Sequence, residues 1–238
     1  MIQDWEGTAL IIGGGDIGHN INDYLCSISP KLNVFLCGRN VNSKNGIYLD
    51  LENDESFLRF EEKISKLNSP LRLVINTSGF LHSGLIKPEK RLSHVLRANM
   101  LKNFSINSIA PILIAKSVEK FIKPELPFSF ASLSARVGSI GDNRLGGWYS
   151  YRASKSAQNQ LLKTLSIEWK RKFPLSIVSI LHPGTCDTKL SKPFQSSVPK
   201  TKLFTPIQAS EYLINVISKQ IPSDSGKFIA WDSSVIQW

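Results

Sequence analysis

Tyr151 and Lys155 are the residues whose types and spacing point most directly to chemistry in this sequence. They lie four positions apart at the start of a segment with helical character, and residues i and i+4 share one face of a helix. An ammonium group beside a phenol stabilises the phenolate and lowers the pKa of the tyrosine from its ordinary value of about 10. The pair is therefore predicted to transfer protons. A lysine-rich helix that carries a tyrosine one turn earlier is the structural alternative.

A glycine-rich turn near the N-terminus is the second chemical signal. Gly13, Gly15 and Gly18 satisfy G-x-G-x-x-G between an apolar run at 8–12 and a predicted helix at 17–28. Glycines permit a tight turn and let backbone N–H groups approach a pyrophosphate at the helix N-terminus. The turn predicts a dinucleotide site whose members are Gly13, Gly15, Asp16, Ile17 and Gly18. A glycine turn without a ligand is the alternative interpretation.

The end of the second predicted strand distinguishes between two dinucleotides. An acidic residue there would bind the ribose 2′-hydroxyl of NAD, whereas this chain has Cys37-Gly38-Arg39-Asn40. The planar guanidinium of Arg39 matches a 2′-phosphate, so NADP is favoured and NAD is kept as the second choice. An ordinary surface arginine is the alternative.

Strand-like and helix-like segments alternate along the chain, which is typical of right-handed βαβ units and a parallel sheet. The fold class predicted is α/β, a single-domain Rossmann fold over residues 1–238 with a doubly wound parallel sheet and helices on both faces. A long irregular segment at about 185–205, rich in proline, serine and lysine, is predicted to be a flap that covers the substrate. The predicted strands are 8–12, 32–37, 71–76, 127–133, 175–181 and 227–231, and the predicted helices are 17–28, 55–67, 92–102, 107–121, 149–172 and 206–219.

Composition excludes several classes of function. The net charge of +10 is dispersed, with no block of five or six like charges and no base-reading motif, so no nucleic-acid partner is predicted. The N-terminal residues resemble neither a secretory signal nor a membrane span. Three scattered cysteines and four histidines lack metal-ligand spacing, so no metal is predicted and a reducing cytoplasm is the expected location.

Six motifs in a fixed order give the chain a family resemblance. They are the glycine turn, Asn76-Thr77-Ser78-Gly79, Asn107, the serine-rich strand end at 132–134, Tyr151-x-x-x-Lys155, and the run from His182 to Thr188. From about residue 8 to 231 the sequence resembles the short-chain dehydrogenase/reductase family, and the stretch 134–143 resembles its C-factor-like branch. Membership would imply hydride transfer between a nicotinamide and a carbonyl or alcohol carbon, in a homodimer or homotetramer built on the two long helices.

The resemblance also implies residue roles. Tyr151 would be the general acid/base, Lys155 would lower its pKa and hold the nicotinamide ribose, and Asn107 would order a water that relays protons, unless it is a helix-surface amide. The remaining residues implied to contact the cofactor are Asp50, Leu51, Asn76, Ser78, Gly79, Pro183, Gly184 and Thr188.

Two departures from the family pattern keep a second function open. The glycine turn is one residue short and places Asp16 near the expected phosphates, where like charge is unfavourable unless its side chain points away. The family's catalytic serine falls on Ala135, so Ser134 is predicted to replace it through a one-residue bulge, with Ser139 as the other candidate. A dinucleotide-binding protein that signals or regulates without turnover is therefore the alternative to an enzyme.

Overall fold

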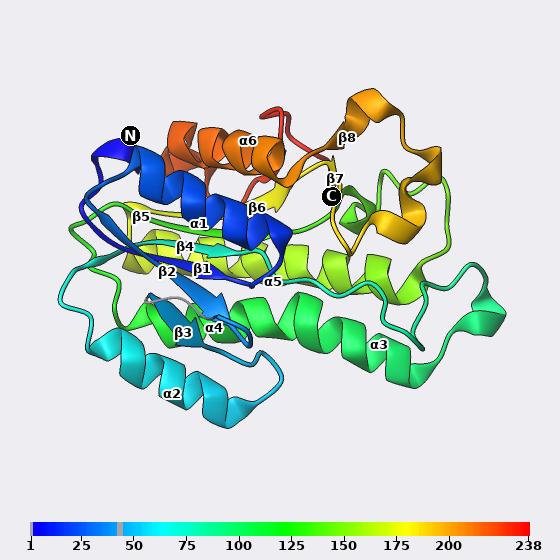
Figure 1. Cartoon of the computed structure of the whole chain (residues 1–238), viewed down its shortest axis with the longest axis horizontal. Helices are drawn as coiled ribbons and strands as arrows, with labels where there is room; N and C mark the ends of the chain where they lie inside the picture. Colours follow the sequence, from blue (N-terminus) through cyan, green and yellow to red (C-terminus); the bar gives the residue numbers. More distant parts are fainter. Residues whose placement is uncertain (1, 42–44) are drawn as a thin grey trace.

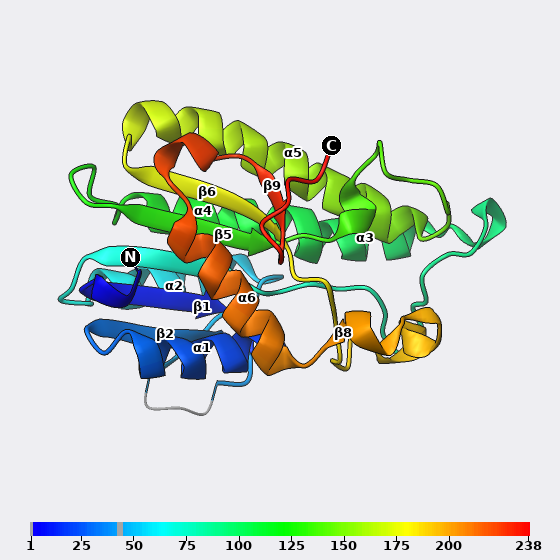
Figure 2. The same ribbon diagram turned by 90° about the horizontal axis from the view of Figure 1, so that it is seen from above.

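A parallel seven-stranded sheet forms the centre of the computed structural model, which describes residues 2–41 and 45–238 (Figures 1 and 2). The strand order is β3-β2-β1-β4-β5-β6-β9, so the chain winds outward in both directions from β1. This confirms the predicted doubly wound Rossmann architecture. The strands are β1 Gly7–Ile12, β2 Leu32–Gly38, β3 Gly46–Tyr48, β4 Leu71–Asn76, β5 Phe128–Leu133, β6 Ser176–His182 and β9 Phe228–Ala230.

Helices cover both faces of the sheet. On one face α1 packs against α6, and on the other α4 packs against α2 and α5; Figure 1 shows α1 and α6 on one side of the sheet and α2 on the other. Among the described residues, no helix has the length and apolar character needed to cross a bilayer. The helices are α1 Asp16–Ile28, α2 Asp54–Ser65, α3 Arg97–Phe104, α4 Ala110–Glu119, α5 Tyr149–Lys172 and α6 Pro206–Lys219.

Strand alternation divides the core into two clusters. In β1, Leu10 and Ile12 pack under α2, α4 and α5, whereas Ala9 and Ile11 pack under α1 and α6. Successive side chains of a strand point to opposite faces, so a strand covered on both sides must be apolar throughout. Trp169 of α5, with no exposed surface, anchors the first cluster against the rings of Phe128 and Phe130.

The two helices predicted at 92–102 and 107–121 are one continuous helical segment. A turn of π-helix at Ser105–Ile109 joins α3 to α4, and the residues before α3 form only a short 3₁₀ turn at Leu92–His94. The π turn widens the helix by one residue and places Asn107 at the widening. Such bulges occur frequently at functional sites. The sequence prediction was wrong here because hydrophobic periodicity does not reveal a single inserted residue.

The segment predicted to be an irregular flap contains regular structure. Strands β7 Thr185–Cys186 and β8 Leu203–Phe204 pair in parallel as a second, two-stranded sheet. Between them lie 3₁₀ turns at Lys192–Ser197 and Lys200–Lys202. The pairing closes the two ends of the flap on each other, and the amide of Asp187 donates to the carbonyl of Phe204 at 2.8 Å. The flap is therefore a closed loop tied at its base.

Candidate functional site

A crevice of about 530 Å³ opens where the chain reverses direction at the carboxyl ends of β1 and β4. Ligands of doubly wound folds bind at this switch point. Most of the residues predicted to contact a dinucleotide line the crevice, and these are Gly13, Gly15, Asp16, Ile17, Gly18, Arg39, Asp50, Leu51, Ser78, Gly79 and Thr188. Lining residues that sequence reasoning missed include Thr77, Phe80, His82, Ile106, Lys189 and Leu190.

The glycine turn is shaped by close backbone approach. Gly13 has φ of +114°, a conformation that residues with side chains rarely adopt. A Cβ atom on Gly18 would lie 1.9 Å from the carbonyl oxygen of Gly13, whereas one on Gly15 would meet nothing within 4 Å. Gly15 also precedes α1 without a side-chain cap, so the first N–H groups of α1 lack an internal acceptor. The open space and the uncapped helix end fit a pyrophosphate.

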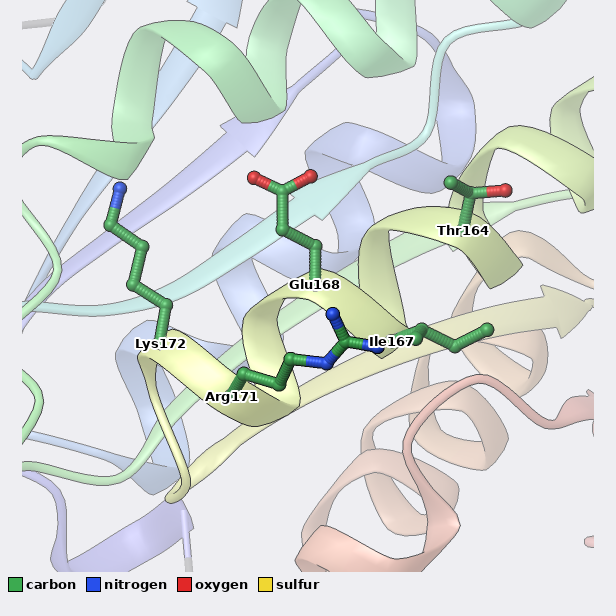
Figure 3. A pocket seen from close by; sticks show the side chains of 5 residues that line it. All are labelled: Thr164, Ile167, Glu168, Arg171 and Lys172. Atoms are coloured by element: carbon green, nitrogen blue, oxygen red, sulfur yellow. The ribbon is translucent and has the colours of Figure 1, made fainter.

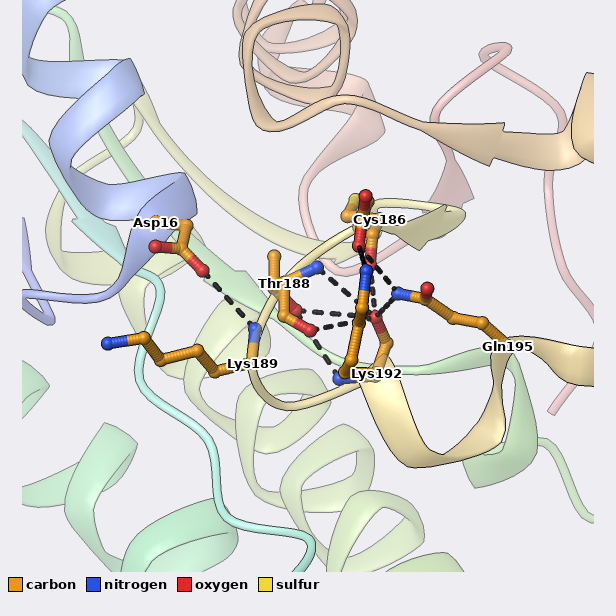
Figure 4. A network of polar contacts seen from close by, with 8 residues as sticks. Asp16, Cys186, Thr188, Lys189, Lys192 and Gln195 are labelled. Carbon is orange, nitrogen blue, oxygen red and sulfur yellow. Dashed lines mark hydrogen bonds and ion pairs between the residues drawn. The ribbon is translucent and has the colours of Figure 1, made fainter.

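The carboxylate of Asp16 is directed toward the flap. Its Oδ2 accepts a hydrogen bond from the backbone amide of Lys189 at 3.3 Å, and Figure 4 shows this contact beside the Thr188 network. The like-charge conflict expected between Asp16 and the phosphates is reduced because the side chain has another partner. The flap thus contacts the glycine turn directly, and Thr188 of the flap lines the crevice.

Arg39 lies at the exposed rim of the crevice, after β2. Within the described part of the chain, no hydrogen bond or ion pair engages its guanidinium. Glu52, one of the acidic residues that line the crevice, forms an ion pair with Lys102 at 2.5 Å. A guanidinium without a partner among the described residues, in a crevice where Glu52 is paired with a lysine, is suited to a phosphate.

Five residues predicted to contact the cofactor do not line the crevice: Tyr151 and Lys155, described below, and Asn76, Pro183 and Gly184. Asn76 is completely buried at the carboxyl end of β4, and its side-chain amide hydrogen-bonds both Ser132 and Ser78. Pro183 and Gly184 lie where the flap begins, and Gly184, at φ of +77°, packs against the ring of Phe204. Their roles toward a cofactor stay predictions.

Tyr151 and Lys155 share one face of α5, but the ammonium does not contact the phenol oxygen. Lys155 Nζ lies 5.9 Å from the centre of the Tyr151 ring and donates to Leu133 O and Gln158 Oε1, both at 2.9 Å. Both residues are buried. Burial raises the pKa of Tyr151 above its ordinary value and lowers the pKa of Lys155 to about 7. The predicted lowering of the tyrosine pKa is therefore wrong for this state, because desolvation outweighs a cation that is held elsewhere.

Lys155 nevertheless lies directly behind the crevice wall. A Cβ atom on Gly79, which lines the crevice, would lie 3.9 Å from Lys155 Nζ and 3.8 Å from Asn107 Oδ1. Asn107 is 1% exposed, which contradicts the surface-amide alternative. Its side chain exchanges two hydrogen bonds with the backbone of Phe80 and donates to Ser154 Oγ at 3.0 Å. Asn107 thus fixes the crevice wall to α5.

Ser134 is held inside the protein. Its hydroxyl donates to Asn159 Oδ1 at 2.6 Å, and the register of β5 on β6 runs from Phe128 to Leu133 without the shift that a bulge would cause. The Ser139 hydroxyl accepts a hydrogen bond from the amide of Asp142 at 3.1 Å. This bond does not use the proton of the Ser139 hydroxyl. Ser132 is a strand residue whose hydroxyl accepts a hydrogen bond from Asn76 Nδ2. Which serine serves the site stays a prediction.

Tyr151 is held in place by an aromatic ring that packs against it and by a buried carboxylate that hydrogen-bonds the first turn of its helix. Trp148 packs edge-on against Tyr151 and against Phe194 of the flap, with ring centres 6.0 and 4.9 Å apart. Trp148 adopts a left-handed conformation, φ 53°, just before α5. Glu89, 2% exposed, accepts from the amide and hydroxyl of Ser150 in the first turn of that helix. Sequence reasoning missed Glu89 because its partner lies 61 residues away.

A second hollow lies on the outer surface of α5 and carries no comparable chemistry. Figure 3 shows its five lining residues, Thr164, Ile167, Glu168, Arg171 and Lys172, along one helix. All five are exposed, and none points into an enclosed polar space. Among the described residues, no cluster of histidine, cysteine, aspartate or glutamate could hold a metal ion.

No family model matches the chain, but the sequence has relatives among characterised proteins. The sequence is 32% identical to a 1-hydroxy-2-glutathionyl-2-methyl-3-butene dehydrogenase of Rhodococcus over 139 residues, which span 58% of each protein. It is 27% identical to the C-signal of Myxococcus xanthus over 71% of this chain and 93% of that protein.

A solved structure shares the whole fold. The NADPH-bound carbonyl reductase from chicken fatty liver superposes with a TM-score of 0.85 at 21% identity, over 99% of this chain and 95% of the other. At this identity the likeness shows the fold alone. With a crevice at the switch point and the Tyr151–Lys155 pair behind its wall, this chain is similar in sequence, ordered motifs and fold to short-chain dehydrogenases/reductases.

Proposed function

We propose that the protein is an NADP-dependent oxidoreductase that interconverts a carbonyl compound and an alcohol. The observation that carries the proposal is the position of Lys155 Nζ, which lies behind Gly79 in the wall of the dinucleotide crevice and on the same helix face as Tyr151. This arrangement brings a proton donor next to a site of dinucleotide shape. Relatives and structural neighbours named as dehydrogenases and carbonyl reductases support it.

The described residues fit the cofactor in three places. The uncapped N-terminus of α1 and the open space at Gly15 would receive the pyrophosphate. Arg39 would pair with a 2′-phosphate, and no acidic residue ends β2 to receive a free ribose hydroxyl. Asp50, whose Oδ1 accepts from the amide of Glu52, keeps its second carboxylate oxygen for the adenine amine.

Bound cofactor would supply the hydride to the substrate carbon or accept it from that carbon, and the chain would manage the proton. Burial keeps the Tyr151 phenol protonated at neutral pH, because the pKa of the phenol is raised. A protonated phenol donates to a carbonyl oxygen, so reduction is the direction that this state favours. Lys155, with a pKa of about 7, would return a proton to Tyr151 and hold the ribose hydroxyls.

The flap would exclude water and shape the substrate. Phe194 and Trp148 form an aromatic surface over Tyr151, and His82 Nε2 ties the flap to the crevice wall through Leu190 O at 3.0 Å. Such a surface favours an aromatic or otherwise apolar carbonyl compound over a charged one.

The test is NADPH oxidation followed by absorbance across a panel of aromatic and aliphatic aldehydes and ketones. Tyr151→Phe should lower kcat about 10²–10⁴-fold, because it removes the proton donor and keeps the ring. Tyr149→Phe is the matched control, since Tyr149 is 42% exposed two positions away. Equal rates for Tyr151→Phe and the native protein on every compound would overturn the proposal.

One observation favours the non-enzymatic alternative. The hydroxyl of Ser134 is occupied by Asn159, and Ala135 stands at the position implied for the catalytic serine. If no compound in the panel is turned over while NADPH still binds in a fluorescence titration, a dinucleotide-binding regulatory protein is the better conclusion.

We also propose that the protein forms homodimers or homotetramers through the long helices. Ile109, Leu161 and Ile167 are between 37% and 51% exposed on the π turn and α5. Light scattering after size exclusion should report two or four copies, and a monomer at micromolar concentration would contradict this. The three free cysteines fit the reducing cytoplasm that we propose as the location.

A further inference from the structure

Gln158 is a completely buried amide, which is unusual for a side chain with two donors and an acceptor to satisfy. Its Oε1 accepts from Lys155 Nζ at 2.9 Å, and its Nε2 donates to Ser132 Oγ at 2.8 Å and to Leu133 O at 3.2 Å. A buried polar group is retained only when it is fully bonded, and this one is. One of its bonds is to Lys155, which the proposed mechanism assigns to the proton relay.

The amide also belongs to a longer chain of hydrogen bonds. Ser132 Oγ accepts from Asn76 Nδ2 at 2.9 Å, and Asn76 Oδ1 accepts from Ser78, which lines the crevice. The sequence of contacts Ser78, Asn76, Ser132, Gln158 and Lys155 therefore runs behind the wall from the crevice to the ammonium, through β4, β5 and α5. Every link is buried or half-buried.

We infer that Gln158 is a positioning residue: its amide holds the Lys155 ammonium against β5 and keeps it charged behind the crevice wall. The inference rests on the proposed function only in assigning Lys155 to the proton relay. An acceptor bonded to an ammonium favours the charged form, and so opposes the effect of burial. Without Gln158, one fixed acceptor, Leu133 O, would remain for Lys155 among the described residues.

The surroundings of Lys155 make the effect measurable. Tyr151 is the titratable group that the described residues place against it, with the ring centre 5.9 Å from Nζ. The loop after β4 presents Gly79, the turn at Arg136–Gly138 presents Gly138, β5 presents a carbonyl and the π turn presents Asn107, none of which titrates. Burial lowers the pKa of Lys155. A change of acceptor therefore acts on Lys155 with Tyr151 as the titratable neighbour among the described residues.

The decisive measurement is the pKa of Lys155 in the cofactor-free protein. Carbon-13 NMR of protein labelled at the lysine ε-carbon reports each titration, and Lys155→Met identifies the resonance. Gln158→Met keeps the length and removes the acceptor, so the pKa of Lys155 should fall by about one unit. Gln158→Glu keeps an acceptor and adds charge, so the pKa should rise.

Gln160→Met is the matched control, because Gln160 is exposed two residues further along α5. It should leave the pKa of Lys155 unchanged. If Gln158→Met does not fold, Ser132→Ala removes one acceptor of the Gln158 amide and should shift the pKa downward by a smaller amount. An unchanged pKa of Lys155 in the folded Gln158 or Ser132 variants would overturn the inference.

Activity gives a separate readout. In an active protein, the limb of the pH profile of kcat that reports Lys155 should move in Gln158→Met in the same direction as the NMR pKa. If the pKa moves and the native protein reduces no carbonyl compound, then the proposed function fails and the role of Gln158 stands.

Discussion

The two ends of the crevice are built from different parts of the polypeptide. At the glycine turn the wall is backbone, open and exposed, with N–H groups and the Arg39 guanidinium that lack partners among the described residues. At the Tyr151 end the wall is side chain, and Lys155, Asn107, Ser134 and Gln158 are all buried with internal hydrogen bonds.

The two ends of the crevice therefore differ in how much they must rearrange before they can bind a cofactor. The backbone end needs no rearrangement to receive an anion, because its donors already face open space. At the other end Lys155 must share or exchange its partners before it can bind a ribose and assist Tyr151. Cofactor binding should therefore depend mainly on the first end and proton transfer on the second, and four experiments test that division.

The largest effect is expected from Gly18→Ala at the backbone end. The new Cβ would lie 1.9 Å from Gly13 O, so the turn must deform, at roughly 3 kcal/mol. We expect NADPH affinity to fall about a hundredfold or more in a fluorescence titration. Gly15→Ala is the control in the same turn, because its Cβ meets nothing within 4 Å and its φ of −88° is ordinary; it should keep the unfolding temperature of the native protein. If both variants had the same thermal stability and the same affinity for NADPH, the close approach of Gly18 to Gly13 O would not explain the need for glycine at position 18.

Arg39→Ala should give the next largest effect. Loss of a charge-assisted bond to a 2′-phosphate costs about 2 kcal/mol, which corresponds to roughly a thirtyfold higher KM for NADPH. The KM for NADH should not change, since that cofactor lacks the phosphate. Arg59→Ala, which removes an exposed guanidinium on α2, should change neither value. A parallel rise in both constants for Arg39→Ala would mean that Arg39 supports the turn and does not choose the cofactor.

The pH dependence of stability tests the buried end. The folded pKa of Lys155, about 7, lies below its ordinary value of 10.5, so between these two pH values the unfolded chain binds one more proton than the folded chain. Stability should therefore rise with pH across this window by up to about 1.4 kcal/mol per pH unit from this residue. Above pH 10 the raised pKa of Tyr151 acts in the opposite direction, because the unfolded tyrosine then ionises first.

Urea denaturation of the cofactor-free protein between pH 7 and 9 measures this slope. Lys155→Met should flatten it, while other titrating groups contribute equally to both proteins. Identical slopes in the native protein and the variant would show that Lys155 titrates at its ordinary value and is not desolvated.

Glu89→Gln should have the smallest effect. The carboxylate accepts two bonds from Ser150 at the N-terminus of α5, where negative charge is favourable. Replacing it by an amide should lower the free energy of unfolding by about 1 kcal/mol. Urea denaturation measures the change, with Glu211→Gln on the exposed side of α6 as control. If kcat also falls while the affinity for NADPH is unchanged, then Glu89 positions Tyr151 through the N-terminus of α5 and does not affect cofactor binding.

Sequence patterns predicted the regular elements well where the pattern is local. The apolar runs that became β1, β2 and β4 and the helices α5 and α6 were placed to within a residue or two, because two-sided burial and 3.6-residue periodicity leave direct traces in composition. The short strand β3, the π turn at Asn107 and the pairing of β7 with β8 were not predicted. Each depends on a partner strand or a single inserted residue, and neither leaves a periodic signal.

The residues of the site likewise fall into those that local sequence patterns predicted and those that depend on distant partners. The glycine turn, Arg39 and the pair Tyr151–Lys155 were found from the sequence because each is a short-range pattern that directly specifies backbone shape or a shared helix face. Glu89, Gln158 and Asn159 were missed, since their partners lie on other elements. The tertiary structure alone decided that Lys155 bonds to Leu133 and Gln158, that Asn159 occupies Ser134, and that burial raises the pKa of Tyr151. Protonation depends on desolvation and on neighbours that are distant in sequence, which only folding brings together.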